Sequence, residues 1–148
     1  MKKSYKHILL ADDDLDDCEF FAEVFTRNFP EVKLSISSDG GKLMSLLGSP
    51  PDPTADLIFL DLNMPIMSGP ECLEKIRNSD TLKDNIVIIF STSSSQSDIA
   101  KMYSLGANYF ITKPADFNDL KNLISKALAI VGETETSRPA FENFYIKL

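Results

Sequence analysis

Short runs of apolar residues alternate along the chain with longer segments in which apolar residues recur at helical spacing. This alternation is typical of strand–helix units wound around a parallel sheet, whose central strands are apolar on both faces. Five strands are predicted, at about residues 6–11, 33–36, 57–60, 86–90 and 109–111. Five helices are predicted between and after them, at about residues 16–28, 41–47, 70–78, 97–105 and 116–131. The pattern indicates an α/β fold with a doubly wound, five-stranded parallel sheet and helices on both faces.

Length and composition narrow the class of protein. The chain has 148 residues, 43% of them hydrophobic, so it can bury the core of one domain without disulfides or a structural metal. Its net charge of −7 disfavours nucleic-acid binding, which depends on Lys and Arg neutralising phosphates. The basic start runs into only four apolar residues, too few for a signal peptide or a membrane span. We therefore expect a cytoplasmic protein that binds neither nucleic acid nor membrane.

The C-terminal segment differs from the rest of the chain. Gly132 ends the last predicted helix, and residues 133–148 follow as a tail too short for an output domain. The predicted domain therefore covers residues 1–132. The aromatic residues of the tail either pack on this domain or contact a partner, and packing on the domain is favoured. His7, the only histidine, is expected at the surface of the first strand.

Charged side chains stand where predicted strands end. Asp12 and Asp13 follow the first strand, Asp61 closes the third, and Lys113 follows the fifth. The carboxyl ends of parallel strands form one edge of the sheet, where ligands bind, so these side chains should share a pocket. Clustered carboxylates repel one another, and Mg²⁺ prefers oxygen ligands and commonly bridges carboxylates and phosphate. A magnesium site is therefore favoured over the alternative of a helix cap beside a surface aspartate.

The same residues suit phosphoryl transfer. Carboxylates act as nucleophiles in aspartyl-phosphate chemistry, which otherwise needs mainly charge neutralisation and alignment. Lys113 would supply positive charge, and Ser91 or Thr92 a hydroxyl, each at the end of a strand. Pro114 forces a turn directly after Lys113, which favours a lysine side chain directed toward the carboxylates over an ordinary surface lysine.

Several motifs follow one another in a specific order. They are LADDD at 10–14, DLNMP at 61–65 with SG at 68–69, FSTS at 90–93, LGA at 105–107 and TKP at 112–114. Over residues 6 to 131 they resemble a two-component response-regulator receiver domain of the stand-alone, chemotaxis-regulator type. The resemblance implies a flavodoxin-like (βα)5 fold.

The resemblance also implies roles at the acidic cluster. Asp61 would accept a phosphoryl group from a sensor histidine kinase. Asp13 and Asp61 would bind Mg²⁺ directly with the backbone carbonyl of Asn63, while Asp12 would act mainly through water. Lys113 would pair with a phosphoryl oxygen or, before phosphorylation, with Asp61.

Further roles are implied at the strands that follow. Ser91 would hydrogen-bond the phosphoryl group and draw the loop after the fourth strand inward, with Thr92 as the alternative if the register differs by one. Phe110 occupies the switch-aromatic position, where tyrosine is frequent, so a hydroxyl contact used by some relatives is missing. Asn63 and Ser93 occupy the positions that influence the lifetime of the phosphoaspartate.

These inferences favour a switch over a metabolic enzyme, with only slow self-catalysed phosphorylation and dephosphorylation. The alternative is a haloacid-dehalogenase-like phosphohydrolase with Asp61 as nucleophile, which needs an acid two positions later, where this chain has Asn63. An electron carrier is disfavoured because the aspartates would repel a flavin phosphate. The resemblance implies that a partner, or a second copy in a homodimer, binds the face formed by residues 97–105, 109–111 and 116–131.

Overall fold

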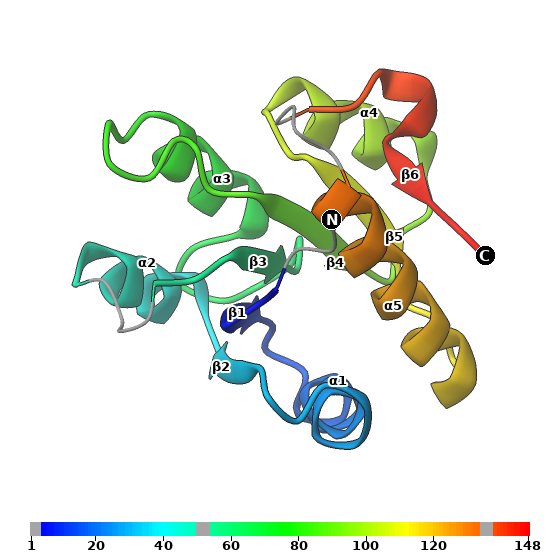
Figure 1. Ribbon diagram of the computed structural model, residues 1–148. Coiled ribbons are helices and arrows are strands. Elements are labelled where there is room, and N and C mark those ends of the chain that lie inside the picture. The colour runs from blue at the N-terminus through cyan, green and yellow to red at the C-terminus, as the bar shows by residue number, and fades with distance from the viewer. Residues whose placement is uncertain (1–3, 50–53, 134–137) are drawn as a thin grey trace.

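A computed structural model describes residues 4–49, 54–133 and 138–148 as one twisted parallel sheet covered by helices (Figure 1). The strand order is β2-β1-β3-β4-β5-β6. The strands are β1 (His7–Ala11), β2 (Lys33–Ser37), β3 (Leu57–Leu60), β4 (Val87–Ser91), β5 (Tyr109–Thr112) and β6 (Tyr145–Ile146). The helices are α1 (Leu15–Asn28), α2 (Gly40–Gly48), α3 (Gly69–Arg77), α4 (Gln96–Ser104), α5 (Phe117–Glu133) and the 3-10 turn η1 (Phe141–Asn143).

The core lies in two layers, one on each face of the sheet. Along β1, Ile8 and Leu10 belong to the layer under α1 and α5, while Leu9 and Ala11 belong to the layer under α2, α3 and α4. All four side chains are buried, because β1 lies between β2 and β3 with helices on both sides. This explains the unbroken apolar runs of the central strands.

Two local features place the acidic residues at the edge of the sheet. The Asp14 carboxylate caps α1 by accepting the Asp17 N–H at 3.0 Å, so the third residue of the aspartate run serves the helix. Gly69, the first residue of α3, lies so close to the end of β3 that an added Cβ would sit 2.2 Å from the Asp61 carbonyl oxygen. Only glycine permits this close approach.

An arginine ties α3 to the loops around β4 and β5. The Arg77 guanidinium donates to the carbonyls of Lys83, Asn85 and Gly106 at 2.7–2.8 Å and to Asn108 Oδ1 at 2.9 Å. One side chain on α3 therefore binds two loops, the one before β4 and the one before β5. Within the described parts of the chain, no helix combines the length and apolar content needed to cross a membrane.

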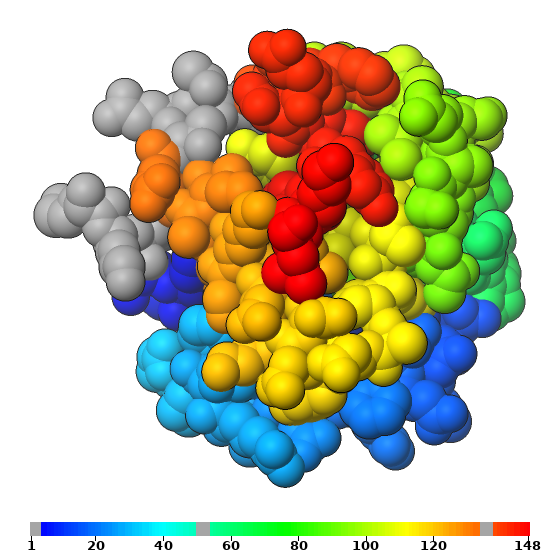
Figure 2. Space-filling model, turned by 90° about the vertical axis from the view of Figure 1, so that its right-hand side faces the viewer, coloured from blue at the N-terminus to red at the C-terminus, as the bar shows by residue number. Residues whose placement is uncertain are grey.

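Two expectations were wrong. The sheet has six strands rather than five, because Tyr145 and Ile146 of the tail pair with β5, which would otherwise be the edge. His7 is fully buried rather than at the surface, since β1 is a central strand, and its Nε2 lies 2.7 Å from Ser35 Oγ. Figure 2 shows the C-terminal residues, in red, lying across the face between α4 and α5.

Candidate functional site

The ends of β1 and β3 bring three carboxylates together. Ala11 pairs with Leu60, and the Asp61 N–H donates to the Ala11 carbonyl at 3.0 Å, which sets the residues that follow side by side. Asp12, Asp13 and Asp61 each offer an oxygen within 4.8 Å of the others. Asp12 and Asp61 are buried, and Asp13 is exposed. One carboxylate of the cluster thus faces solvent while two lie in the floor of the site.

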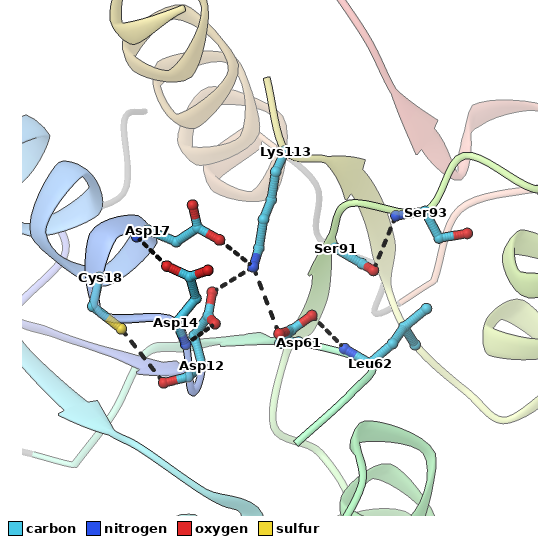
Figure 3. A network of polar contacts seen from close by, with 9 residues as sticks. All are labelled: Asp12, Asp14, Asp17, Cys18, Asp61, Leu62, Ser91, Ser93 and Lys113. Atoms are coloured by element: carbon cyan, nitrogen blue, oxygen red, sulfur yellow. Dashed lines mark hydrogen bonds and ion pairs between the residues drawn. The ribbon is translucent and has the colours of Figure 1, made fainter. Parts of the chain in front are cut away.

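Lys113 reaches this cluster from the end of β5. Its Nζ lies 2.7 Å from Asp12 Oδ2, 2.8 Å from Asp17 Oδ2 and 3.6 Å from Asp61 Oδ2 (Figure 3). The expected ion pair with Asp61 is present, but it is the longest of the three. The side chain of Lys113 is only 8% exposed, so Lys113 is a buried residue of the site and not a surface lysine.

Asp17 was missed as a site residue. The helix dipole alone explains an acidic residue in the first turn of α1, yet the Asp17 carboxylate is one of the two close partners of Lys113. Asp17 lies in the first turn of α1, and its carboxylate reaches Lys113 because of how this helix packs against the sheet. The run of acidic residues at 12–14 and 16–17 was the available signal, but it identifies Asp17 as a pocket residue only when the packing of the helix is also known.

The site perturbs two ionisable groups strongly. Burial, followed by the neighbouring Asp12 carboxylate, raises the pKa of Asp61 to about 7 against the opposing effects of Lys113 and the Leu62 N–H, which donates to Asp61 Oδ1 at 2.8 Å. Burial alone would lower the pKa of Lys113, but hydrogen bonds to Asp12 and Asp17 and the charge of Asp61 outweigh it and raise that pKa. Lys113 is therefore positively charged at neutral pH, whereas a pKa of about 7 leaves Asp61 divided between its protonated and ionised forms.

This donor set fits a divalent cation. Burial first, and then the charge of Asp12, disfavour the ionised form of Asp61, and a cation held by the three carboxylates would offset both effects. Oxygen-only ligands suit Mg²⁺ or Mn²⁺ rather than the softer metals. Asn63, the predicted source of a backbone carbonyl ligand, is exposed in the loop after β3.

The loop after β4 lies beside this cluster. Ser91, the last residue of β4, is only 1% exposed, whereas Thr92 is exposed. The Ser93 N–H donates to Ser91 Oγ at 3.2 Å, and the Ser93 hydroxyl donates to Asp98 of α4 at 2.6 Å. Phe110 on β5 is fully buried.

The loop between β3 and α3, which begins at Asp61, carries backbone strain. Ile66 has a φ of 70°, a left-handed conformation that is unusual for a β-branched side chain, and the residue is 82% exposed. Strain of this kind is commonly found at functional sites. Ile66 lies five residues after Asp61 in the chain.

Comparison with known proteins gives a consistent result. Residues 8–125 match the sequence profile of the response regulator receiver domain. The response regulator Rcp1 of Synechocystis sp. is 31% identical over 135 residues, covering 88% of this chain and 92% of Rcp1. The rice two-component response regulator ORR5 (Oryza sativa subsp. japonica) is 30% identical over 122 residues, covering 82% of this chain and 88% of the relative.

Solved structures agree with the sequence comparisons. The Mn²⁺-bound form of Rcp1 superimposes with a TM-score of 0.76 and 32% identity, over 91% of this chain and 99% of that one. The phosphorylated cyanobacterial phytochrome response regulator RcpA gives a TM-score of 0.77 and 30% identity, over 93% of this chain and all of RcpA. With the motifs, the sheet order and the acidic cluster in agreement, this chain belongs to the receiver domains of two-component response regulators.

Proposed function

We propose that Asp61 is the phosphoacceptor of this receiver and that a sensor histidine kinase is its phosphodonor. The observation that carries the proposal is the Asp61 carboxylate at the end of β3, beside Asp12, Asp13 and the Lys113 amine. In the transfer, the P–N bond of a phosphohistidine breaks, a P–O bond to Asp61 Oδ forms, and the kinase imidazole keeps the electron pair of the broken bond. Little else is needed beyond alignment and charge neutralisation.

The metal is proposed to be Mg²⁺, held by Asp13, Asp61 and the backbone carbonyl of Asn63, with Asp12 acting mainly through water. Bound there, it supplies positive charge to the carboxylates and to the phosphoryl oxygens. Support comes from the oxygen-only donor set and from a relative solved with Mn²⁺ bound. Asp61 attacks phosphorus as the ionised carboxylate. Without a metal its pKa is raised to about 7, so the reactive form predominates only above that pH.

The remaining side chains are assigned to the response that follows phosphorylation. Lys113 moves its hydrogen bonds from Asp12 and Asp17 toward a phosphoryl oxygen, because a dianion attracts it more strongly than a carboxylate does. Ser91 donates its hydroxyl to the phosphoryl group, with Thr92 as the less buried alternative. Phe110 is the switch aromatic.

The chain acts as a switch in this proposal, with slow self-catalysed phosphorylation and dephosphorylation whose rates depend on Asn63 and Ser93. A haloacid-dehalogenase-like hydrolase is disfavoured, because Asn63 stands where that mechanism needs an acid. We assign residues 1–132 to the receiver and 133–148 to an appended segment, and we place the protein in the cytoplasm. The downstream partner, or a second copy in a homodimer, is assigned to the α4–β5–α5 face.

The proposal is tested by titrating beryllofluoride, a phosphoryl mimic that binds carboxylates, into the protein with Mg²⁺ while recording amide NMR spectra. We expect saturable changes around Asp61, Ser91 and Lys113 in the wild type and in the Asp16→Asn control, an exposed residue of α1 outside the cluster. Asp61→Asn should not respond. A wild type that gives no response, or an Asp61→Asn variant that responds equally, would refute the assignment.

A further inference from the structure

The short strand β6 holds the tail against β5. Tyr145 and Ile146 pair in parallel with Phe110 and Ile111, and the Phe110 N–H donates to the carbonyl of Phe144 at 3.1 Å. The Phe144 side chain is fully buried, with its ring centre 6.3 Å from that of Phe110, and the Tyr145 ring lies 5.9 Å from Phe110. The residue at the switch-aromatic position is therefore packed against the tail.

A chain of hydroxyl groups runs from this strand to the loop after β4. Thr112 Oγ1 donates to the Ser93 carbonyl at 2.8 Å, and Tyr145 Oη lies 2.7 Å from the same Thr112 oxygen. A threonine hydroxyl has only one proton, and a carbonyl oxygen can only accept. The Tyr145 hydroxyl must therefore be the donor, which gives the chain one direction: from Tyr145 to Thr112 to Ser93.

The chain ends at the residue that organises the loop. Ser93 donates its backbone N–H to Ser91 Oγ at 3.2 Å and its hydroxyl to Asp98 of α4 at 2.6 Å. Any movement of Ser91 toward a phosphoryl group on Asp61 would shift the Ser93 carbonyl as well, since the two residues are joined through their backbone. The bond from Thr112 would then lengthen, and the Tyr145 hydroxyl would bind a less well-ordered partner.

We propose that Tyr145 is a positioning residue of the switch: through Thr112 it holds the loop after β4 in its resting position, with a hydroxyl that Phe110 lacks. The inference rests on the proposed function of Asp61 and Ser91. Phosphorylation opens the hydroxyl chain and loosens β6 from β5. Because coupling between two sites is reciprocal, opening the chain by mutation must in turn favour phosphorylation.

The hydroxyl chain is first tested without any phosphodonor. In Tyr145→Phe, the amide NMR signals of Ser93 and Asp98 should shift. Two control variants each remove another tyrosine hydroxyl, one that donates to a backbone carbonyl: Tyr5→Phe, whose partner is Leu128 on α5, and Tyr103→Phe, whose partner is Pro139 in the tail. Neither should move the Ser93 signal. An unshifted Ser93 in Tyr145→Phe would overturn the proposal whatever Asp61 does.

The coupling is then measured as the affinity for beryllofluoride in the presence of Mg²⁺. Loss of one hydrogen bond that favours the resting loop should tighten binding about fivefold in Tyr145→Phe and in Thr112→Val, while the double variant should gain little more than either. Tyr5→Phe and Tyr103→Phe should bind like the wild type. Equal affinities in Tyr145→Phe and wild type would overturn the role of Tyr145 and leave Asp61 as the phosphoacceptor. A wild type that does not bind beryllofluoride at all would overturn both the role of Tyr145 and the assignment of Asp61.

Discussion

Replacing Asp61 with asparagine should stabilise the metal-free protein at neutral pH. The folded state raises the pKa of this carboxyl from 3.8 to about 7, chiefly through burial and then through Asp12, so ionising it opposes folding. At about 1.4 kcal/mol for each pH unit the rise corresponds to about 4 kcal/mol. Solvent screening reduces this figure, and we expect a gain of roughly 1–2 kcal/mol in the free energy of unfolding.

The pH dependence gives the sign of the effect. Between about pH 4 and pH 7 the folded protein retains a proton on Asp61 that the unfolded chain has lost, so the contribution of this group to stability falls as pH rises through that window. The advantage of Asp61→Asn over the wild type should therefore be near zero at pH 4, grow across the window and level off above pH 7.

Urea unfolding in EDTA at several pH values measures both quantities. The control is Asp16→Asn, which removes an exposed carboxylate from the first turn of α1 and should lower stability by about 0.5 kcal/mol through the helix dipole. Adding Mg²⁺ should stabilise the wild type more than Asp61→Asn. An Asp61→Asn variant that is no more stable than the wild type at pH 7.5 would refute the reasoning.

Three further substitutions test the frame around the site by urea unfolding. Ile66→Asn should raise the free energy of unfolding by about 1 kcal/mol, because asparagine tolerates the positive φ that strains a β-branched residue, and a loss of stability would contradict this. Arg77→Ala should lower the free energy of unfolding by about 3 kcal/mol, because it leaves carbonyls without their charged donor. The control Arg27→Ala, which removes one partner of an exposed helical ion pair, should lower it by less than about 0.5 kcal/mol. Equal losses would show that the hydrogen bonds of Arg77 do not stabilise the fold. Gly69→Ala should cost more than about 2 kcal/mol and slow phosphorylation, since its Cβ would overlap the Asp61 carbonyl, and wild-type stability would show that the loop yields easily.

The central sheet was predictable because burial on both faces leaves a direct trace in sequence. The apolar runs of β1, β3 and β4 came from that constraint, and the family profile matches the chain over residues 8–125. The clustering of Asp12, Asp13 and Asp61 followed from the rule that parallel strands end at one edge. The roles assigned to the individual site residues stay predictions until the variants are measured.

The parts that were missed depend on tertiary packing. A two-residue strand such as Tyr145–Ile146 has too little pattern to be recognised, and it pairs only because β5 presents an open edge. Asp17 looked like an ordinary helix-start residue until the orientation of α1 brought it to Lys113. The burial of His7 was missed because the sequence does not show that β1 lies between two other strands, and a polar residue at the start of a strand is more often exposed.

If Asp61 receives the phosphoryl group, that group can be located on it chemically. The wild type and Asp61→Asn are incubated with acetyl phosphate and Mg²⁺, quenched, and measured by intact mass and then by borohydride trapping with peptide mapping. We expect one phosphoryl group on the wild type, trapped at Asp61, and none on the variant. A phosphoryl group trapped at another residue, or an unmodified wild type, would contradict it.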